Sequence, residues 1–222
     1  MRHFLDVTKS NLFFARGIIL VEGWAEEILI PAIAQAIDKE LSTKEISIIN
    51  VGSTAFLHFA RIFIPADDEK KMNYPVAIVT DLDVRPNENG TFDEESEARN
   101  SEMKKRFIDE DNNSHIKVCI AKQWTLEWCL FNSKSFRIPF MSAVERVHNR
   151  TKEFQKNTEG QWNEAEFKNK LIEMLLPNSN HKLDKVAVAS ELALSISTQH
   201  IIPEDDDMYI KYIIQAINHV CK

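Results

Sequence analysis

The sequence predicts an α/β fold in which a mainly parallel sheet is flanked by helices and followed by a helical C-terminal extension. Between residues 17 and about 122, short apolar runs alternate with stretches of helical periodicity. Repeated succession of strand and helix implies right-handed crossovers, which place neighbouring strands parallel. After residue 125 only helical stretches follow. We therefore expect an α/β core over residues 1–130 and a helical extension over residues 131–222.

Four apolar runs have the length and β-branched content of buried strands. They cover residues 17–21, 46–51, 74–80 and 115–121. Helical stretches separate them over about 24–40, 54–64 and 95–110, and Pro31 predicts a kink or a separate cap in the first. Further helices are expected at 125–131, 142–157, 163–176, 185–197 and 205–219, punctuated by Pro139, Pro177 and Pro203.

Composition argues against several classes of protein. No apolar run approaches the roughly 20 residues of a membrane span, and the N-terminus lacks the features of a secretory signal. The three cysteines show no CxxC spacing, which argues against a disulfide framework or a cysteine zinc site. We therefore expect a cytoplasmic protein with no membrane association.

The net charge of −7, from 27 basic and 34 acidic residues, argues against tight DNA binding by this chain alone. It does not exclude a nuclease, because clustered metal-binding acids or a basic partner domain would also account for it. The seven histidines show no HxxxH or HExxH pairing, which argues against a zinc hydrolase.

The first acidic pair follows the first apolar run. Glu22 and Glu26 lie four residues apart across a strand-to-helix turn, with Gly23 between them. Glycine permits a sharp reversal and close approach of a ligand, and a helix N-terminus favours anions such as phosphate. Alternatively, acids in a first helical turn only complement the helix dipole. For Glu26 alone the two interpretations are equally supported, but the pair favours a binding site.

The second acidic pair, Asp81 and Asp83, follows the third apolar run directly. Residues two apart in an extended segment point to the same side, so they offer two hard oxygen ligands to Mg²⁺, Mn²⁺ or Ca²⁺. The alternative is a polar turn in which aspartates cap free amides. Because α/β sheets place ligands at strand ends, we expect both pairs to converge around a divalent metal.

A further acid follows the fourth strand in Thr125-Leu126-Glu127. Thr125 is expected as the N-cap of a helix, with Glu127 in its first turn. The segment leaves the sheet at the same edge as the other acids. Glu127 is therefore a candidate fifth carboxylate.

These motifs together resemble a known family. Val21-Glu22-Gly23-x-x-Glu26 followed by Thr80-Asp81-Leu82-Asp83 resembles the Toprim fold of topoisomerases, primases and several nucleases. The segments Lys9–Ala15, Asn50–Ser53 and Thr125–Trp128 narrow the resemblance to the C-terminal Toprim region of OLD (overcoming lysogenization defect) nucleases. The resemblance covers most of residues 5–130, which would form the Toprim-like catalytic core.

The resemblance implies a metal-dependent DNA endonuclease (nicking or cleaving) that uses two Mg²⁺ or Mn²⁺ ions for phosphodiester hydrolysis. Its implied metal ligands are Glu22, Glu26, Asp81, Asp83 and Glu127. Glu22 and Asp81 would act in catalysis with a late lysine. Lys185 matches the family pattern best, Lys182 is its rival, and a solvated surface lysine is the competing interpretation.

Members of this family carry an N-terminal ABC-type ATPase, whereas this chain contains no GxxxxGK[ST] motif. The chain is then either a fragment of a longer protein or a stand-alone relative. Because Leu5–Phe14 resembles the junction inside the longer family sequences, we expect a fragment that acts on DNA together with such an ATPase domain. Two alternatives remain open. One is a non-catalytic metal-binding interaction module, and the other is a different Toprim enzyme such as a primase or topoisomerase.

Overall fold

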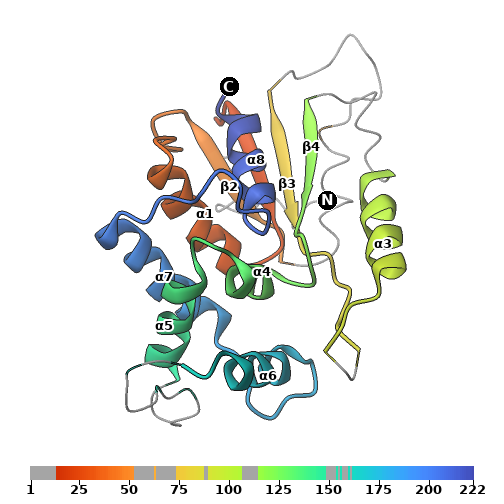
Figure 1. The fold of residues 1–222 in the computed structure, drawn as a ribbon. Helices are drawn as coiled ribbons and strands as arrows, with labels where there is room; N and C mark the ends of the chain where they lie inside the picture. Colours follow the sequence, from red (N-terminus) through yellow and green to blue (C-terminus); the bar gives the residue numbers. More distant parts are fainter. Residues whose placement is uncertain are drawn as a thin grey trace.

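The computed structural model describes a four-stranded, all-parallel sheet with the order β2-β1-β3-β4 (Figure 1). The strands are β1 (Gly17–Val21), β2 (Ile46–Asn50), β3 (Val76–Thr80) and β4 (Ile116–Ile120). The structure describes residues 14–52, 63, 74–87, 90–106, 115–148, 154, 156, 160 and 162–222. The expected α/β fold with a parallel sheet is confirmed.

The register of the sheet brings the acidic segments to one edge. Leu20 of β1 pairs with Ile78 of β3, and continuing this register by two residues aligns Glu22 with Thr80. Thr80 in turn pairs with the last residue of β4. Since all strands are parallel, the segments that follow β1, β3 and β4 emerge at the same end of the sheet.

Seven described helices accompany the sheet. They are α1 (Trp24–Ala36), α3 (Glu94–Arg106), α4 (Leu126–Asn132), α5 (Arg137–Val147), α6 (Glu164–Leu175), α7 (Lys185–Gln199) and α8 (Lys211–Val220). Except for Phe63, the helix expected at 54–64 lies outside the described residues. So do the chain before residue 14 and the expected helical residues 107–110, 149–153, 155 and 157.

Three expected helix boundaries were wrong. Helix α1 ends at Ala36 and is followed by Asp38 with a left-handed φ of 56°. Helix α5 begins at Arg137 rather than at residue 142, with Pro139 in its first turn, where a backbone N–H needs no helical partner. Helix α8 begins at Lys211 rather than at residue 205.

A buried aspartate explains the late start of α8. Asp207 is 1% exposed and accepts hydrogen bonds from Ser133 Oγ at 2.5 Å, Ser135 N at 3.0 Å and Tyr209 N at 3.2 Å. A buried carboxylate needs such partners. The segment before α8 is therefore held as a turn against the α4–α5 connection.

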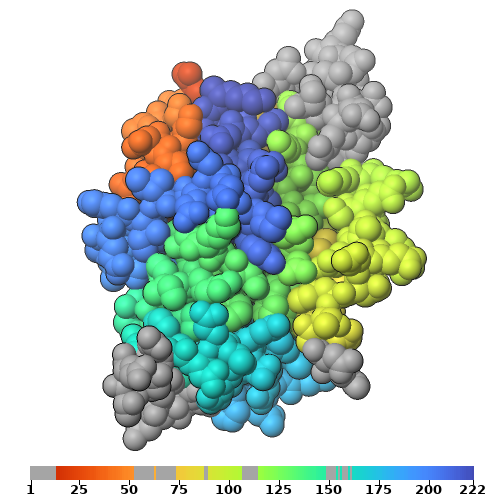
Figure 2. Space-filling model, viewed as in Figure 1, coloured from red at the N-terminus to blue at the C-terminus, as the bar shows by residue number. Residues whose placement is uncertain are grey.

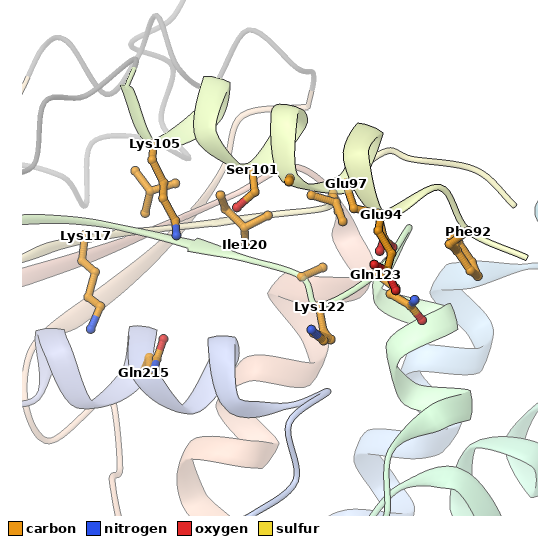
Figure 3. A pocket seen from close by; sticks show the side chains of 14 residues that line it. Phe92, Glu94, Glu97, Ser101, Lys105, Lys117, Ile120, Lys122, Gln123 and Gln215 are labelled. Atoms are coloured by element: carbon orange, nitrogen blue, oxygen red, sulfur yellow. The ribbon is translucent and has the colours of Figure 1, made fainter.

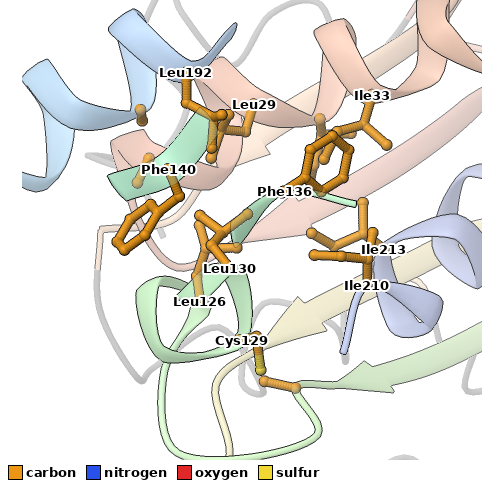
Figure 4. Close-up of a cluster of buried hydrophobic side chains, with 14 of the residues drawn as sticks. Leu29, Ile33, Leu126, Cys129, Leu130, Phe136, Phe140, Leu192, Ile210 and Ile213 are labelled. Atoms are coloured by element: carbon orange, nitrogen blue, oxygen red, sulfur yellow. The ribbon is translucent and has the colours of Figure 1, made fainter. Parts of the chain in front are cut away.

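One apolar cluster joins the sheet to the C-terminal helices (Figure 4). Leu29 of α1, Phe136 before α5, Leu192 of α7 and Ile213 of α8 all belong to it, and each is fully buried. Helix α1 packs along α7, and α8 crosses β3 and β4. The boundary expected at residue 130 stays a prediction, although residues on both sides of it share this core.

Candidate metal centre

The turn after β1 brings two glutamates close to the sheet. Glu22 continues the line of the strand and accepts a short hydrogen bond from the hydroxyl of Thr80, the last residue of β3. Gly23 is the N-cap of α1, and Glu26 lies in the first turn. A Cβ added at Gly23 would come 3.1 Å from the Glu26 carboxylate. Glycine at this position therefore leaves room for Glu26 beside the strand end.

Lys104 of α3 joins three segments of this edge. Its ammonium lies 2.6 Å from Asp83 Oδ2, 3.1 Å from Thr80 Oγ1 and 2.5 Å from the main-chain oxygen of Asp81. Through Thr80 it is linked to Glu22. We call Glu22, Thr80, Asp83 and Lys104 the α3 half of the site.

The loop after β3 is fixed by backbone contacts. The amides of Leu82 and Asp83 both donate to the carbonyl of Trp124, at 3.0 and 2.9 Å. The side chain of Asn100 in α3 donates to the carbonyl of Leu82 at 3.0 Å. Asp83 adopts a left-handed φ of 64°, which aspartate tolerates better than most residues. These contacts hold the Asp83 carboxylate beside Lys104.

The second half of the site is built around the start of α4. Asp81 Oδ1 accepts a hydrogen bond of 2.8 Å from the amide of Leu126, the first residue of α4, whose N-terminus favours negative charge. The adjacent Glu127 is 3% exposed, and its Oε2 lies 2.8 Å from Lys185 Nζ. Lys185 begins α7. We call Glu26, Glu127 and Lys185 the α7 half, and Asp81 links the two halves.

The pKa shifts of these carboxyl groups show that the carboxylates lie close enough to repel one another. Burial, followed by the charge of Glu127, raises the pKa of Glu26 to about 7. Burial also raises the pKa of Asp81 well above its usual value, and Glu127 and Glu26 raise it further. The pKa of Glu22 is raised by burial, although the Thr80 hydrogen bond and Lys104 oppose the shift. Such a group of acids gains free energy from added positive charge.

Lys185 supplies part of that positive charge. Burial lowers the pKa of its ammonium, but the carboxylates of Glu127, Asp81 and Glu26 outweigh burial and leave the pKa raised. Lys185 is therefore charged at any physiological pH. Its competitor Lys182 is exposed, and among the described residues it makes no ion pair or hydrogen bond with these carboxylates.

The donor atoms fit a hard divalent cation. Every candidate ligand offers a carboxylate oxygen, and Mg²⁺ and Mn²⁺ prefer oxygen ligands to nitrogen or sulfur ligands. With the side chains as they stand, however, the described residues contain no group of three or more His, Cys, Asp or Glu side chains arranged to hold an ion. Lysine ammonium groups contact Asp83 and Glu127 instead. Metal binding would therefore require these contacts to rearrange.

Comparison with known proteins identifies the fold family. Residues 13–83 match the family model described as "Overcoming lysogenization defect protein-like, TOPRIM domain". This part of the chain is therefore similar to the Toprim domain of OLD-family proteins. No curated protein sequence matches the chain significantly.

Solved structures extend the similarity over nearly the whole chain. The C-terminal region of the Burkholderia pseudomallei OLD protein is 25% identical with a TM-score of 0.55, and the match covers 95% of this chain and 100% of that one. The C-terminal region of the Xanthomonas campestris pv. campestris OLD protein is 21% identical with a TM-score of 0.55, covering 94% and 95% of the two chains. The latter similarity concerns the fold alone.

This Toprim-like fold brings all five expected acids and Lys185 to one end of the sheet. Sequence reasoning missed two further residues, Thr80 as a hydrogen-bonding partner and Lys104. Lys104 lies in a helix without an apolar stripe, and only the spacing of Glu97, Asn100 and Lys104 along one face of α3 could have indicated it. The spacing alone does not distinguish Lys104 from a solvated lysine.

A cavity of about 750 Å³ adjoins the Toprim site between α3, β4 and α8 (Figure 3). Leu82, which lies between the two aspartates of the site, lines it. Lys105, Lys117 and Lys122 extend toward it from three different segments, while Glu94 and Glu97 line it near α3's start. On the face in Figure 2, α3 stands out beside β4 and forms one wall.

Within the described part of the chain, no helix has the length and apolar character needed to cross a membrane.

Proposed function

We propose that this chain is the metal-dependent DNA endonuclease domain of an OLD-family protein, which works with an ABC-type ATPase domain of the same full-length protein. The observation that carries the proposal is the gathering of five carboxylates and two lysines at the carboxyl end of a parallel Toprim sheet. The C-terminal regions of OLD proteins share the fold over nearly the whole chain.

Two Mg²⁺ or Mn²⁺ ions would be held by the two halves of the site. Glu22 and Asp83 would serve the α3 half, Glu26 and Glu127 the α7 half, and Asp81 both. Bound divalent ions supply Lewis acidity and a water of lowered pKa for phosphodiester hydrolysis.

The chain's own residues have distinct roles in this proposal. Thr80 orients the Glu22 carboxylate through its hydrogen bond, and the α4 N-terminus fixes the rotamer of Asp81 through the amide of Leu126. Lys185, half-exposed at the start of α7, would turn toward a phosphate and offset the charge that develops there.

The basic cavity beside the site supports a polyanionic substrate. Lys105, Lys117 and Lys122 would contact phosphates of a DNA strand that runs past Asp83. The net charge of the whole chain is −7, so this local basic lining is the chain's contribution to DNA binding, with further contacts from the ATPase domain.

A topoisomerase-like function lacks support from the tyrosines. Tyr212 is 5% exposed within α8, and burial raises its pKa well above the usual value, which opposes nucleophilic attack by its oxygen. Tyr74 and Tyr209 make no described hydrogen bond with the acidic site through their hydroxyls. A non-catalytic metal-binding module remains the main competing function.

Plasmid nicking in Mn²⁺ separates these functions. The wild-type chain should nick supercoiled DNA, and Asp81→Ala should lower the rate by at least about 100-fold, because it removes a ligand shared by both ions. Asp205→Ala, at an exposed aspartate in the connection between α7 and α8, is the matched control. If neither the wild-type chain nor the full-length protein nicks DNA, or if Asp81→Ala nicks equally well, the proposed function is wrong.

A further inference from the structure

Lys104 is an unusual lysine for a surface helix. Among the residues of α3, all of which are described, Lys104 alone is buried, and its side chain is only 8% exposed. Its neighbour Lys105 is exposed. A buried ammonium is costly unless anionic or polar oxygens surround it. The position of Lys104 is therefore set by the oxygens that it contacts.

Those oxygens are of three kinds. The ammonium contacts the carboxylate of Asp83, the hydroxyl of Thr80 and the carbonyl of Asp81 at 2.5 to 3.1 Å. The Thr80 hydroxyl connects to Glu22. Carboxylate, hydroxyl and carbonyl oxygens are also the ligands of hard divalent cations, at about 2.0 to 2.1 Å for Mg²⁺. An ammonium and a divalent ion cannot share these oxygens, because they would overlap and repel each other.

We propose that Lys104 occupies one of the two metal positions in the metal-free chain, and that a divalent ion enters the α3 half only by displacing its ammonium. The inference rests on the proposed metal-dependent function. It adds that the two ions load in order: the first binds tightly in the α7 half, and the second binds more weakly in the α3 half.

A divalent ion that enters the α7 half would displace fewer contacts than one that enters the α3 half. Lys185 is 44% exposed, and the structure gives its ammonium a hydrogen bond to a single carboxylate oxygen, on Glu127. It can turn into solvent while it stays charged. Lys104 would have to leave a buried position and three oxygen contacts. This difference separates the affinities of the two halves.

Binding of Mn²⁺ alone to the intact chain, measured by titration calorimetry and by electron paramagnetic resonance, tests the order of loading. The wild-type chain should bind two ions of distinct affinity. Lys104→Met keeps the length of the side chain without its charge and should tighten the weaker site at least about tenfold, or about 1.4 kcal/mol. Lys105→Met removes the same charge one residue away and should leave both affinities within about twofold.

Three results would overturn the inference. Two sites of equal affinity in the wild-type chain would do so, and so would Lys104→Met affinities equal to those of Lys105→Met. Failure of the wild-type chain to bind Mn²⁺ at all would also refute the proposed function, whereas the first two results leave that function intact.

A second measurement needs no variant and therefore covers the case in which Lys104→Met does not fold. Lysine acylation followed by mass spectrometry is applied to the wild-type chain across a Mg²⁺ titration. Lys104 should be protected without metal and should become reactive as the weaker site fills, while exposed Lys105 stays reactive throughout. Protection of Lys104 that persists at saturating Mg²⁺ overturns the inference.

Discussion

The two halves of the acidic site use lysine in different ways. Lys104 is buried in the last turn of a polar helix and contacts a carboxylate, a hydroxyl and a carbonyl. Lys185 begins an apolar helix, is 44% exposed and contacts one carboxylate. A buried, multiply bonded ammonium acts as a fixed counter-ion, whereas an exposed one can be redirected to a ligand. The comparison therefore separates a lysine held among the oxygens of the site from one that is suited to contact a phosphate.

The largest effect that sharpens this comparison is expected at Lys185. Lys185→Ala should lower the rate of plasmid nicking about 100-fold at saturating Mn²⁺, because removing a group that stabilises transition-state charge typically costs that much. Its metal affinities should not weaken, since the lysine competes with cations. Lys182→Ala, three residues earlier and exposed, is the control and should nick normally. Equal losses in both variants would refute the assignment.

The two halves should also differ in metal affinity. Glu127→Gln should weaken Mn²⁺ binding at the tighter site by about tenfold or more. Asp83→Asn should weaken binding mainly at the weaker site. Each substitution removes a negatively charged ligand from one half only. Calorimetric titration of both variants gives the comparison. If the two substitutions weaken the same site equally, the division into halves is wrong.

The pH dependence of stability provides a third test. The folded-state pKa of Glu26, about 7, lies above its ordinary value of 4.5, so the folded chain binds this proton more tightly. The associated stability is complete below pH 4.5 and is lost as pH rises through about 7. Without metal, the melting temperature should fall over this window by roughly 10 °C.

Glu26→Gln should reduce that slope, as should Mg²⁺ added near pH 7. Glu173→Gln, an exposed glutamate in α6, is the matched control and should retain the wild-type slope. An identical slope in Glu26→Gln would show that Glu26 is not coupled to the acidic site. Thermal denaturation followed by circular dichroism gives the melting temperature of the wild-type chain, with and without Mg²⁺, and of both variants.

The smallest effect is expected outside the two halves. Replacing both Lys117 and Lys122 with glutamate should weaken DNA binding several-fold and reduce the salt dependence of the affinity by about two phosphate contacts. Lys39 and Lys44, in the connection between α1 and β2, provide a control pair of the same charge. Fluorescence anisotropy over a range of salt concentrations measures both. Unchanged salt dependence would exclude the cavity as a DNA contact.

The sequence predicted the strands and the acids that follow them because both signals are local. An apolar run such as Val76–Thr80 identifies a buried strand, and the next residues necessarily emerge at its end. Parallel topology then brings Glu22 and Asp81 together without any information about side chains.

The role of Lys104 and the helix boundaries could not be predicted from the sequence, because they depend on contacts between segments that are distant in the chain. Lys104 is specified by oxygens of residues 80, 81 and 83, more than twenty positions away. The start of α8 depends on Asp207, which contacts Ser133 and Ser135. Pro139 suggested a break between helices because proline is unfavourable inside a helix. It is tolerated here because it lies in the first turn of α5, and the start of α5 could not be located from the sequence.

Packing between α1 and α7 has a consequence for how activity could be tuned. Glu26 and Lys185 sit on these two helices, whose buried faces meet through residues such as Leu29 and Leu192. The distance between the Glu26 carboxylate and the Lys185 ammonium therefore depends on an apolar interface that is buried within the protein. Replacing an apolar residue of this interface with a smaller one would change that distance. The activity could therefore be altered without any change to the polar residues of the site.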